Sequence, residues 1–321
     1  MYPNNSSFDQ WIKPPLEDVW YLTGPTASGK SRVAMRLAEK IDAEIISVDS
    51  MAVYRGMDIG TAKPSNHERE RIPHHLIDVV DPTMDYSVSQ FVTDAHEQAS
   101  KIRSRGKQVL LVGGTPLYLK SLMCGMFMGP PADWEFRSAV EADVAAYGIE
   151  SLRQRLEQVD PLSAFKILHG DVRRMTRALE VLKITGRPLS HWQNQFEQQC
   201  EPKGCKSFVL TWDRHALHER VNRRVDNMFE HGLLAEVQSL IHTYGRLGRT
   251  ASQAVGYKEP LEFMQGLVDR ACMIDKVKAH TRQLVRRQEM WFRSMPMFQR
   301  LAIERESDLD RDLEQFSIRN S

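Results

Sequence analysis

The sequence predicts an α/β fold, a doubly wound parallel sheet with a helical insertion domain. Short apolar runs alternate with amphipathic helical patterns in the first part of the chain, as in repeated βαβ units. A charged, helix-favouring stretch without a clear strand follows, and an apolar run then returns at residues 207–213. We therefore expect a loose extension at 1–18, a core made of 19–129 and 204–300, an insertion at 130–203 and a charged tail at 301–321.

Individual elements of the core follow from their patterns. Residues 19–23 and 44–48 are apolar enough for buried strands, and residues 31–40 between them have helical periodicity. The runs "HHLIDVVDP" and "KQVLLVGGT" predict two further parallel strands, because both end in turn residues. Residues 215–293 are expected to be helical.

Composition narrows the class of protein. The chain has 321 residues, of which 41% are apolar, and a formal net charge of +1, so any nucleic-acid contact must come from local basic stripes. The four cysteines lack the paired spacing of a zinc site, and no segment resembles a signal peptide or a membrane span. We expect a cytoplasmic protein without a membrane partner, acting as a monomer.

The stretch "GPTASGKS" matches the phosphate-loop pattern and stands between a predicted strand and a predicted helix, which makes the core P-loop NTPase-like. Glycines allow the backbone amides to turn toward an anion, and the helix N-terminus adds positive potential. The lysine supplies a point charge and the final serine is a candidate Mg²⁺ ligand. The predicted phosphate-binding residues are Gly24, Pro25, Thr26, Ala27, Ser28, Gly29, Lys30 and Ser31.

The phosphate loop alone leaves the reaction open. A kinase usually has a metal-binding aspartate at the end of a further strand, but "QVLLV" ends in Gly113, Gly114 and Thr115. Asp78 and Asp81 in "LIDVVD" keep the kinase reading possible. Asp49, at the end of its own strand, fits a metal ligand or a base as well as it fits a turn residue.

Seven segments together resemble the tRNA dimethylallyltransferase family. They are "GPTASGKS", "EIISVDSMAVYRGMDIGTAKP", "PHHLIDVVDP", "LLVGGTPLYLK", "RRMTRALEV", "AVGYKE" and "TRQLVRRQEMWFR". The resemblance implies that the loop binds the diphosphate of dimethylallyl diphosphate and that the acceptor is N6 of the adenine immediately 3′ of the anticodon. It also implies Asp49 as the base, Thr115 as a hydroxyl lining the reaction channel and Arg224 as a cation at the leaving group.

The same resemblance implies a surface that binds the tRNA anticodon stem-loop. Flipping the adenine out of its stack costs the least free energy in an already distorted loop, so an RNA loop is a plausible substrate. The implied tRNA-binding residues are Asp49, Ser50, Met51, Ala52, Thr115, Arg137, Arg173, Arg174, Met175, Thr176, Arg177, Gln253, Ala254, Val255, Gly256, Tyr257, Lys258, Arg282 and Arg286.

The predicted helix from Ala271 to Arg293 has a cationic side. At about 100° per residue, Met273, Val277, Leu284 and Trp291 fall within about 40° of one another. Arg282, Arg286 and Arg293 lie on the opposite side. We expect the first face to pack on the protein. An arginine stripe of this kind is ordinarily a solvated surface, but the family resemblance implies that it contacts RNA phosphates.

Three other functions remain open at this point. An adenylate isopentenyltransferase would share the fold and the donor but accept AMP, ADP or ATP. A small-molecule kinase would bind ATP in the loop, and a non-catalytic RNA-binding protein would keep the loop without using it. The long insertion and the basic helix favour tRNA over a free nucleotide.

Overall fold

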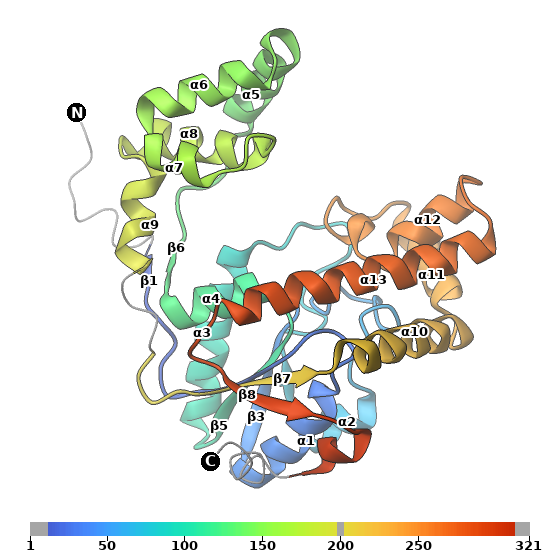
Figure 1. Ribbon diagram of the computed structural model, residues 1–321. Helices are drawn as coiled ribbons and strands as arrows, with labels where there is room; N and C mark the ends of the chain where they lie inside the picture. The colour runs from blue at the N-terminus through green and yellow to red at the C-terminus, as the bar shows by residue number, and fades with distance from the viewer. Residues whose placement is uncertain (1–11, 198–201, 312–321) are drawn as a thin grey trace. The chain divides into compact units, whose positions relative to one another are not determined.

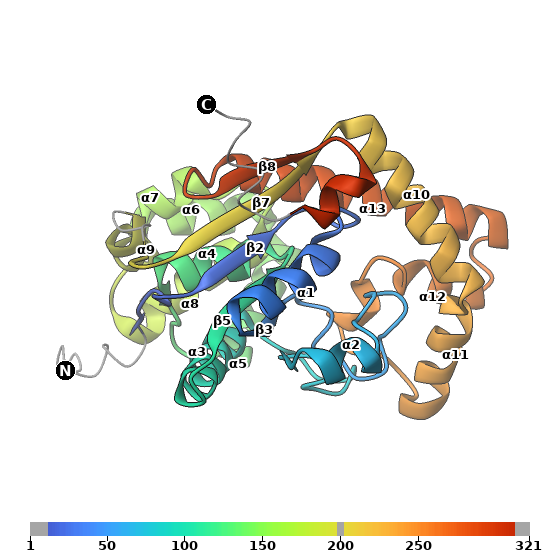
Figure 2. The same ribbon diagram turned by 90° about the horizontal axis from the view of Figure 1, so that it is seen from below.

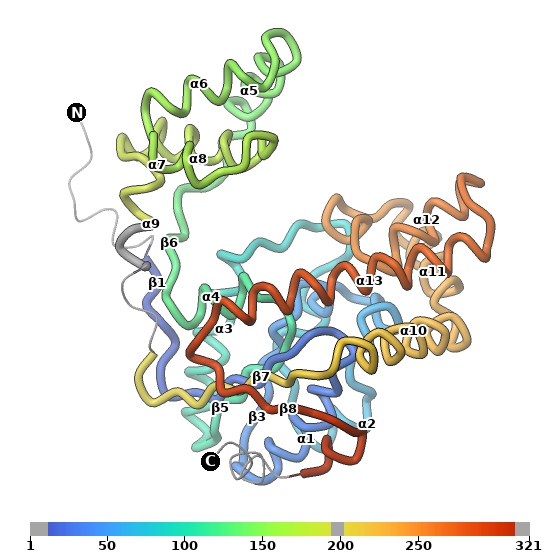
Figure 3. Tube along the Cα trace, viewed as in Figure 1, coloured from blue at the N-terminus to red at the C-terminus, as the bar shows by residue number. Residues whose placement is uncertain are grey.

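A computed structural model describes residues 12–197 and 202–311. The described chain divides into two compact units. One holds residues 16–121 and 202–311 and contains the large sheet, and we call it the catalytic unit. The other holds residues 12–15 and 122–197 and is mainly helical, and we call it the helical unit. Figure 3 traces how the chain passes from the catalytic unit into the helical unit and back.

The catalytic unit is built on a six-stranded sheet in which every neighbouring pair is parallel. The strand order is β4-β3-β5-β2-β7-β8, so the strand before the phosphate loop lies between β5 and β7 (Figure 2). This is the doubly wound α/β arrangement expected from the sequence. The strands are β2 (Trp20–Thr23), β3 (Ala43–Val48), β4 (His74–His75), β5 (Gln108–Gly113), β7 (Lys206–Trp212) and β8 (Gln299–Ile303).

Helices cover both faces of this sheet. Helix α1 (Lys30–Ile41) packs on β2, β3 and β5, where its apolar face meets Ile45 and Leu110. Helix α3 (Val88–Ser104) also packs on β3 and β5, and Ile46 and Leu111, which point away from α1, are fully buried as well. Two-sided burial explains why these strands are continuous apolar runs.

Several of the remaining helices of the catalytic unit pack on one another. Helix α13, the longest, packs against α10 and α12 (Figure 1). These elements are α2 (Asn66–Arg71), α4 (Pro116–Cys124, which ends in the helical unit), α10 (Arg214–Glu230), α11 (Leu233–Tyr244), the 3-10 turn η3 (Ala251–Gln253), α12 (Lys258–Met264) and α13 (Arg270–Arg293).

Two expectations for the core need correction. Only His74 and His75 of the run "HHLIDVV" form a strand, because Leu76 and Asp78 have positive φ and residues 78–80 bond to the loop at 52–53 instead. The expected charged tail is wrong up to residue 310. Residues 299–303 form β8 and residues 306–310 form the 3-10 helix η4, with Leu301 and Leu309 buried in the core. Residues 312–321 lie outside the described chain.

The helical unit has its own core. Its helices enclose a cluster that includes Val140, Leu156 and Met175, and the short strands β1 and β6 pair antiparallel. Residues 12–13 therefore belong to a strand, although the sequence predicted a loose extension there. The elements are β1 (Ile12–Lys13), β6 (Met126–Phe127), α5 (Trp134–Tyr147), α6 (Ile149–Val159), α7 (Pro161–Lys166), α8 (Val172–Thr185) and α9 (Leu189–Glu197).

Among the described residues, no helix combines the length and the apolar character needed to cross a bilayer.

Candidate active site

The phosphate loop joins β2 to α1 and presents free amides. Ala27 and Gly29 have φ values of 64° and 86°, which curl the backbone into an anion-binding turn. Gly29 is the N-cap of α1, and its carbonyl oxygen accepts from the Arg32 amide at 3.1 Å. Within the described residues no partner is found for the amides of Lys30 and Ser31, so these two amides and the positive end of the helix are available to an anionic ligand. Ala27 is not a glycine, so its left-handed backbone carries strain of the kind that gathers at functional sites.

Side chains from two neighbouring elements fix the outer side of the loop. Arg220 of α10 donates from Nε to the Ala27 carbonyl oxygen at 2.8 Å, and Trp212 of β7 donates from Nε1 to the Ser28 carbonyl oxygen at 2.9 Å. The Arg220 guanidinium also lies over the Trp212 ring, 4.4 Å from its centroid. Two loop carbonyls are bound in this way, so the protein itself holds the outer side of the loop.

Gln288 of α13 links the loop to the end of β5. Its Oε1 accepts from the Thr26 amide at 2.9 Å, and its Nε2 donates to the Gly114 carbonyl oxygen at 2.6 Å. The side chain is buried. Sequence analysis missed this residue. The available signal was a glutamine on the buried side of the helix, in step with Val285 and Phe292.

Asp49 and Thr115 lie together at the carboxyl ends of β3 and β5. Asp49 accepts with Oδ1 from the amides of Met51 at 2.8 Å and Ala52 at 3.3 Å, so it is a turn residue. Both bonds use the same oxygen, and no protein partner of Oδ2 is found within the described residues. Thr115 Oγ1 accepts from the Ser50 amide at 3.1 Å. The predicted channel hydroxyl, Thr115, therefore binds the residue that directly follows the predicted base, Asp49.

Lys30 and Arg224 bring two half-buried cations next to Asp49. Burial lowers the pKa of Lys30 to about 8, the charge of Arg224 acts in the same direction, and Asp49 opposes it. Burial also lowers the pKa of Arg224, again opposed by Asp49. Two cations and one carboxylate leave a surplus positive charge in a low-dielectric place. The site is therefore prepared for an anion.

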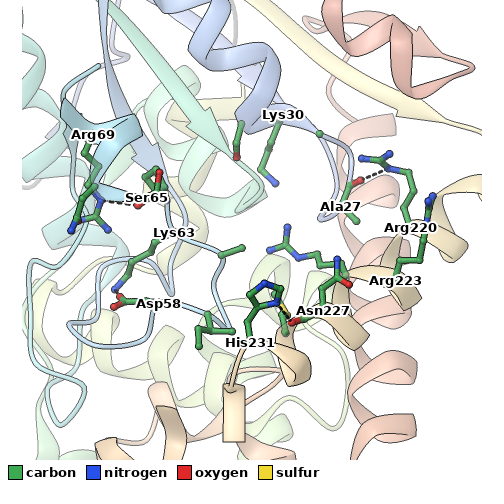
Figure 4. A pocket seen from close by; sticks show the side chains of 18 of the residues that line it. Ala27, Lys30, Asp58, Lys63, Ser65, Arg69, Arg220, Arg223, Asn227 and His231 are labelled. Carbon is green, nitrogen blue, oxygen red and sulfur yellow. Dashed lines mark hydrogen bonds and ion pairs between the residues drawn. The ribbon is translucent and has the colours of Figure 1, made fainter. Parts of the chain in front are cut away.

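Two cavities meet at these cations. The large cavity has a volume of about 780 Å³ and is lined by Lys63, Arg69, Arg220 and Arg223 as well as by the phosphate loop (Figure 4). The small cavity, of about 170 Å³, contains Asp49, Met51, Ala52 and Gln288 in its lining. The residues that line both are Lys30, Ser31, Ala62, Lys63, Pro64 and Arg224.

The acids that kept the kinase reading open are engaged elsewhere. Asp78 pairs with Lys63 at 2.6 Å and Arg69 at 2.7 Å, and Asp81 pairs with Arg55 at 2.8 Å. The strand β5 ends in Gly113, as the sequence indicated. Carboxylates that are already ion-paired are poor replacements for a metal-binding aspartate at a strand end.

A magnesium ion fits this site only together with a phosphorylated ligand. Among the described residues, no group of three or more acidic, histidine or cysteine side chains could hold a metal ion by itself. Ser31 is exposed and lines both cavities. One hydroxyl combined with phosphate oxygens and water is a common coordination shell for Mg²⁺.

The predicted tRNA-binding residues of the catalytic unit differ in their accessibility. Ala254, Val255 and Tyr257 line the small cavity, but Tyr257 is fully buried. The Gly256 amide donates to Glu259 at 2.8 Å. Of this segment, the side chains exposed to a large partner are those of Gln253 and Lys258.

Helix α13 corrects the expected packing face. Trp291 is 37% exposed and Leu284 lines the small cavity instead of the core. Two polar residues, Thr281 and Gln288, lie on the buried face of the helix. Arg286 and Arg293 are exposed as predicted, and Arg282 donates to Asn222 at 2.6 Å. The buried residues of the helix are Met273, Val277, Thr281, Val285, Gln288 and Phe292.

In the helical unit, the predicted tRNA-binding residues serve mixed roles. Arg137 forms two 2.8 Å bonds with the buried carboxylate of Glu180, and Arg177 pairs with the same group. Met175 and Thr176 are buried within this unit, so their side chains do not reach a partner. Arg173 and Arg174 are the exposed members of this set.

Comparisons with known proteins agree with this geometry. A tRNA dimethylallyltransferase of Rhodopirellula baltica is 46% identical, covering 98% of this chain and 96% of its own, and one of Geobacter metallireducens is 43% identical, covering 85% and 88%. The crystal structure of the tRNA isopentenylpyrophosphate transferase of Bacillus halodurans matches with a TM-score of 0.68 at 36% identity, over 94% of each chain.

A structure of a eukaryotic dimethylallyltransferase acting on tRNA matches with a TM-score of 0.79 at 28% identity, over 94% of this chain and 78% of that one. The family model described as IPP transferase matches residues 52–295. The phosphate loop after β2, the absence of an acid at the end of β5, the bond between the Ser50 amide and Thr115 beside Asp49, and these matches lead to one conclusion: the chain belongs to the IPP transferase family.

Proposed function

We propose that this protein transfers a dimethylallyl group from dimethylallyl diphosphate to N6 of the adenine immediately 3′ of the anticodon in tRNA. The products are N6-(dimethylallyl)adenosine in tRNA and diphosphate. The observation that carries the proposal is the meeting of Lys30, Arg224 and Asp49 where the two cavities join. Surplus positive charge suits a diphosphate, and the carboxylate suits an amine that must lose a proton.

The donor diphosphate binds the phosphate loop in this scheme. Negative charge grows on the bridging oxygen as the bond between carbon and oxygen breaks. The amides of the first turn of α1, Lys30 and Arg224 stabilise that charge without moving. When bound, Mg²⁺, held by Ser31, adds charge neutralisation on the diphosphate oxygens. Removing one such cation typically raises a barrier by about 3 kcal/mol.

The acceptor amine approaches from the small cavity, where Asp49 lies. Adenine N6 is a poor nucleophile because its lone pair is delocalised into the ring. A carboxylate that accepts a proton as the new carbon–nitrogen bond forms lowers this barrier. The turn bonds from Met51 and Ala52 to Oδ1 orient the carboxylate and leave Oδ2 for the proton. Thr115 holds the same turn through the Ser50 amide.

Contact with the tRNA is proposed for the exposed basic side chains. Arg286 on α13 and Arg173 and Arg174 on α8 are accessible to phosphates. Arg137 and Arg177 pair with Glu180, so we assign them to shaping the surface of the helical unit. We also propose that the protein acts as a monomer, in the cytoplasm, and that it binds the anticodon stem-loop of the tRNA.

The test supplies isotopically labelled dimethylallyl diphosphate and Mg²⁺ with unmodified tRNA and AMP in the same tube. Label in tRNA alone supports the proposal. Label in AMP would identify an adenylate isopentenyltransferase instead. Label in neither, with ATP consumed when small acceptors are offered, would restore the kinase reading, and tRNA binding without any turnover would indicate a binding protein.

A further inference from the structure

A short loop separates the two cavities of the catalytic unit. Residues 58–64, which we call the partition loop, follow β3 and precede α2. Asp58 and Ile59 line the large cavity, Gly60 and Thr61 line the small one, and residues 62–64 line both. Lys63 and Asp58 face the large cavity in Figure 4. The loop is therefore the wall beside the place where donor and acceptor are proposed to meet.

One carboxylate of α11 holds this loop from behind. Glu236 accepts three consecutive backbone amides: those of Asp58 at 3.0 Å, Ile59 at 2.7 Å and Gly60 at 3.3 Å. The Tyr257 hydroxyl donates to the same carboxylate at 2.7 Å. Amide bonds to an ionised acceptor are stronger than neutral ones, and three in a row fix the backbone direction.

Close packing permits little freedom to the loop on this side. A Cβ on Gly60 would lie 2.4 Å from Cε2 of Tyr257, so the backbone passes directly over the ring. Tyr257 itself is fully buried, and burial together with the Glu236 charge raises the pKa of its hydroxyl. The hydroxyl therefore remains a donor to Glu236 throughout the working range of pH.

The other side of the loop is fixed as well. The Lys63 side chain is only 1% exposed, and its Nζ donates to the Tyr54 carbonyl oxygen at 2.6 Å, to Asp58 at 2.7 Å and to Asp78 at 2.6 Å. An ammonium has three hydrogens, so this one is fully used by the protein. Lys63 is thus part of the wall and not a further cation for the diphosphate.

We propose that Glu236 is a positioning residue that keeps the partition loop closed and so keeps water away from the reacting carbon of the donor. This proposal rests on the proposed function. When the carbon–oxygen bond to diphosphate breaks, the electron-poor carbon accepts an electron pair from either adenine N6 or a water oxygen. Capture by water gives dimethylallyl alcohol, diphosphate and a proton, which is hydrolysis without transfer. A fixed wall favours the adenine because it excludes the competing nucleophile.

The test counts both fates of the donor. Wild-type enzyme, Glu236→Ala and the control Gln238→Ala are given labelled donor, Mg²⁺ and tRNA, and dimethylallyl alcohol and prenylated tRNA are measured together. Gln238 is an exposed residue on the same helix. We expect the ratio of alcohol to prenylated tRNA to rise about tenfold in Glu236→Ala, since several bonds to a charged group are lost. The control ratio should equal that of wild type.

A variant that preserves the amide acceptor guards against misfolding. Glu236→Gln retains one oxygen for the loop amides and gains a donor, so its ratio should lie between wild type and Glu236→Ala. If both variants lose alcohol and tRNA product in equal proportion, Glu236 has only a general structural role and the proposal is overturned. An unchanged ratio with unchanged turnover overturns it too. Failure of wild-type enzyme to prenylate tRNA would instead overturn the proposed function.

Discussion

Lys30 shows at the scale of one residue how the site trades stability for function. Its pKa in the folded protein is about 8, against about 10.4 for a free lysine. The folded state therefore releases this proton more easily than the unfolded state does. The resulting penalty on folding is complete below pH 8, where both states carry the proton, and it is removed as pH rises toward 10.4, because the folded-state lysine is then neutral and unfolding must take up a proton.

Lys30→Met should accordingly abolish transfer and stabilise the fold at pH 7, by up to about 3 kcal/mol. Chemical unfolding of wild type and variant at several pH values measures the difference. The gain should shrink between pH 8 and pH 10.4 and vanish above it. A variant that is less stable than wild type at pH 7 would show that the ammonium is better compensated than its surroundings indicate.

Asp49 has two roles, because Oδ1 accepts the turn bonds and Oδ2 is the proposed proton acceptor. A substitution can remove the second role and keep the first. Asp49→Asn keeps an oxygen that accepts from the Met51 amide and loses the negative charge. We expect turnover to fall by about 10²–10⁴ while tRNA affinity changes little. Single-turnover rates and a filter-binding assay with unmodified tRNA measure the two quantities. Equal loss of binding and turnover would assign Asp49 to the turn alone.

At the scale of the element, α13 does two tasks on two sides. Its buried side carries Gln288 to the phosphate loop, and its exposed side carries Arg286 and Arg293. A helix that is anchored at the active site and also contacts RNA would set the distance between the RNA backbone and the reacting base.

Arg286→Ala should weaken tRNA binding and lower the slope of log affinity against log salt by about one, because one phosphate contact disappears. Affinity measured at several salt concentrations gives the slope. Arg300→Ala, an exposed arginine on β8, is the control and should leave the slope unchanged. An unaltered slope in Arg286→Ala would remove this residue from the RNA surface.

The C-terminal elements β8 and η4 support the phosphate loop. A Cβ on Gly29 would lie 2.5 Å from Cδ1 of Leu309, which shows how closely this leucine contacts the loop. Glu306 of the same helix pairs with Arg220, the residue that holds the Ala27 carbonyl.

Leu309→Ala should destabilise the protein by about 2–5 kcal/mol and raise the KM for the donor, because the loop loses its outer contact. Thermal unfolding and steady-state kinetics with varied donor measure these effects. Leu267→Ala, at a site that is 67% exposed, is the matched control. A normal KM in a destabilised Leu309→Ala would limit the role of Leu309 to packing.

At the scale of the whole molecule, the sequence predicted the elements that short segments encode and missed the contacts between distant segments. The phosphate loop, β2, β3 and β5 follow from glycine spacing and apolar runs, and the position of Asp49 follows from the rule that parallel strand ends share one edge. Thr115 and the role of Asp49 as base came from the family resemblance. The contacts of Gln288, Arg220 and Glu236 could not be predicted, because they join residues far apart in the sequence. The bonds to Thr26, Ala27 and Asp58 span 262, 193 and 178 residues, respectively. β8 was missed because a short strand in a charged context has no distinctive periodicity.

The contact between Leu309 and Gly29 also has a consequence for biosynthesis. A ribosome makes the phosphate loop well before the segment that supports it, so a nascent chain that ends at α13 still lacks β8 and η4. Such a chain has the residues to attract diphosphate but not the complete structure that holds the loop. The order of synthesis thus delays a competent enzyme until the chain has been made through residue 310.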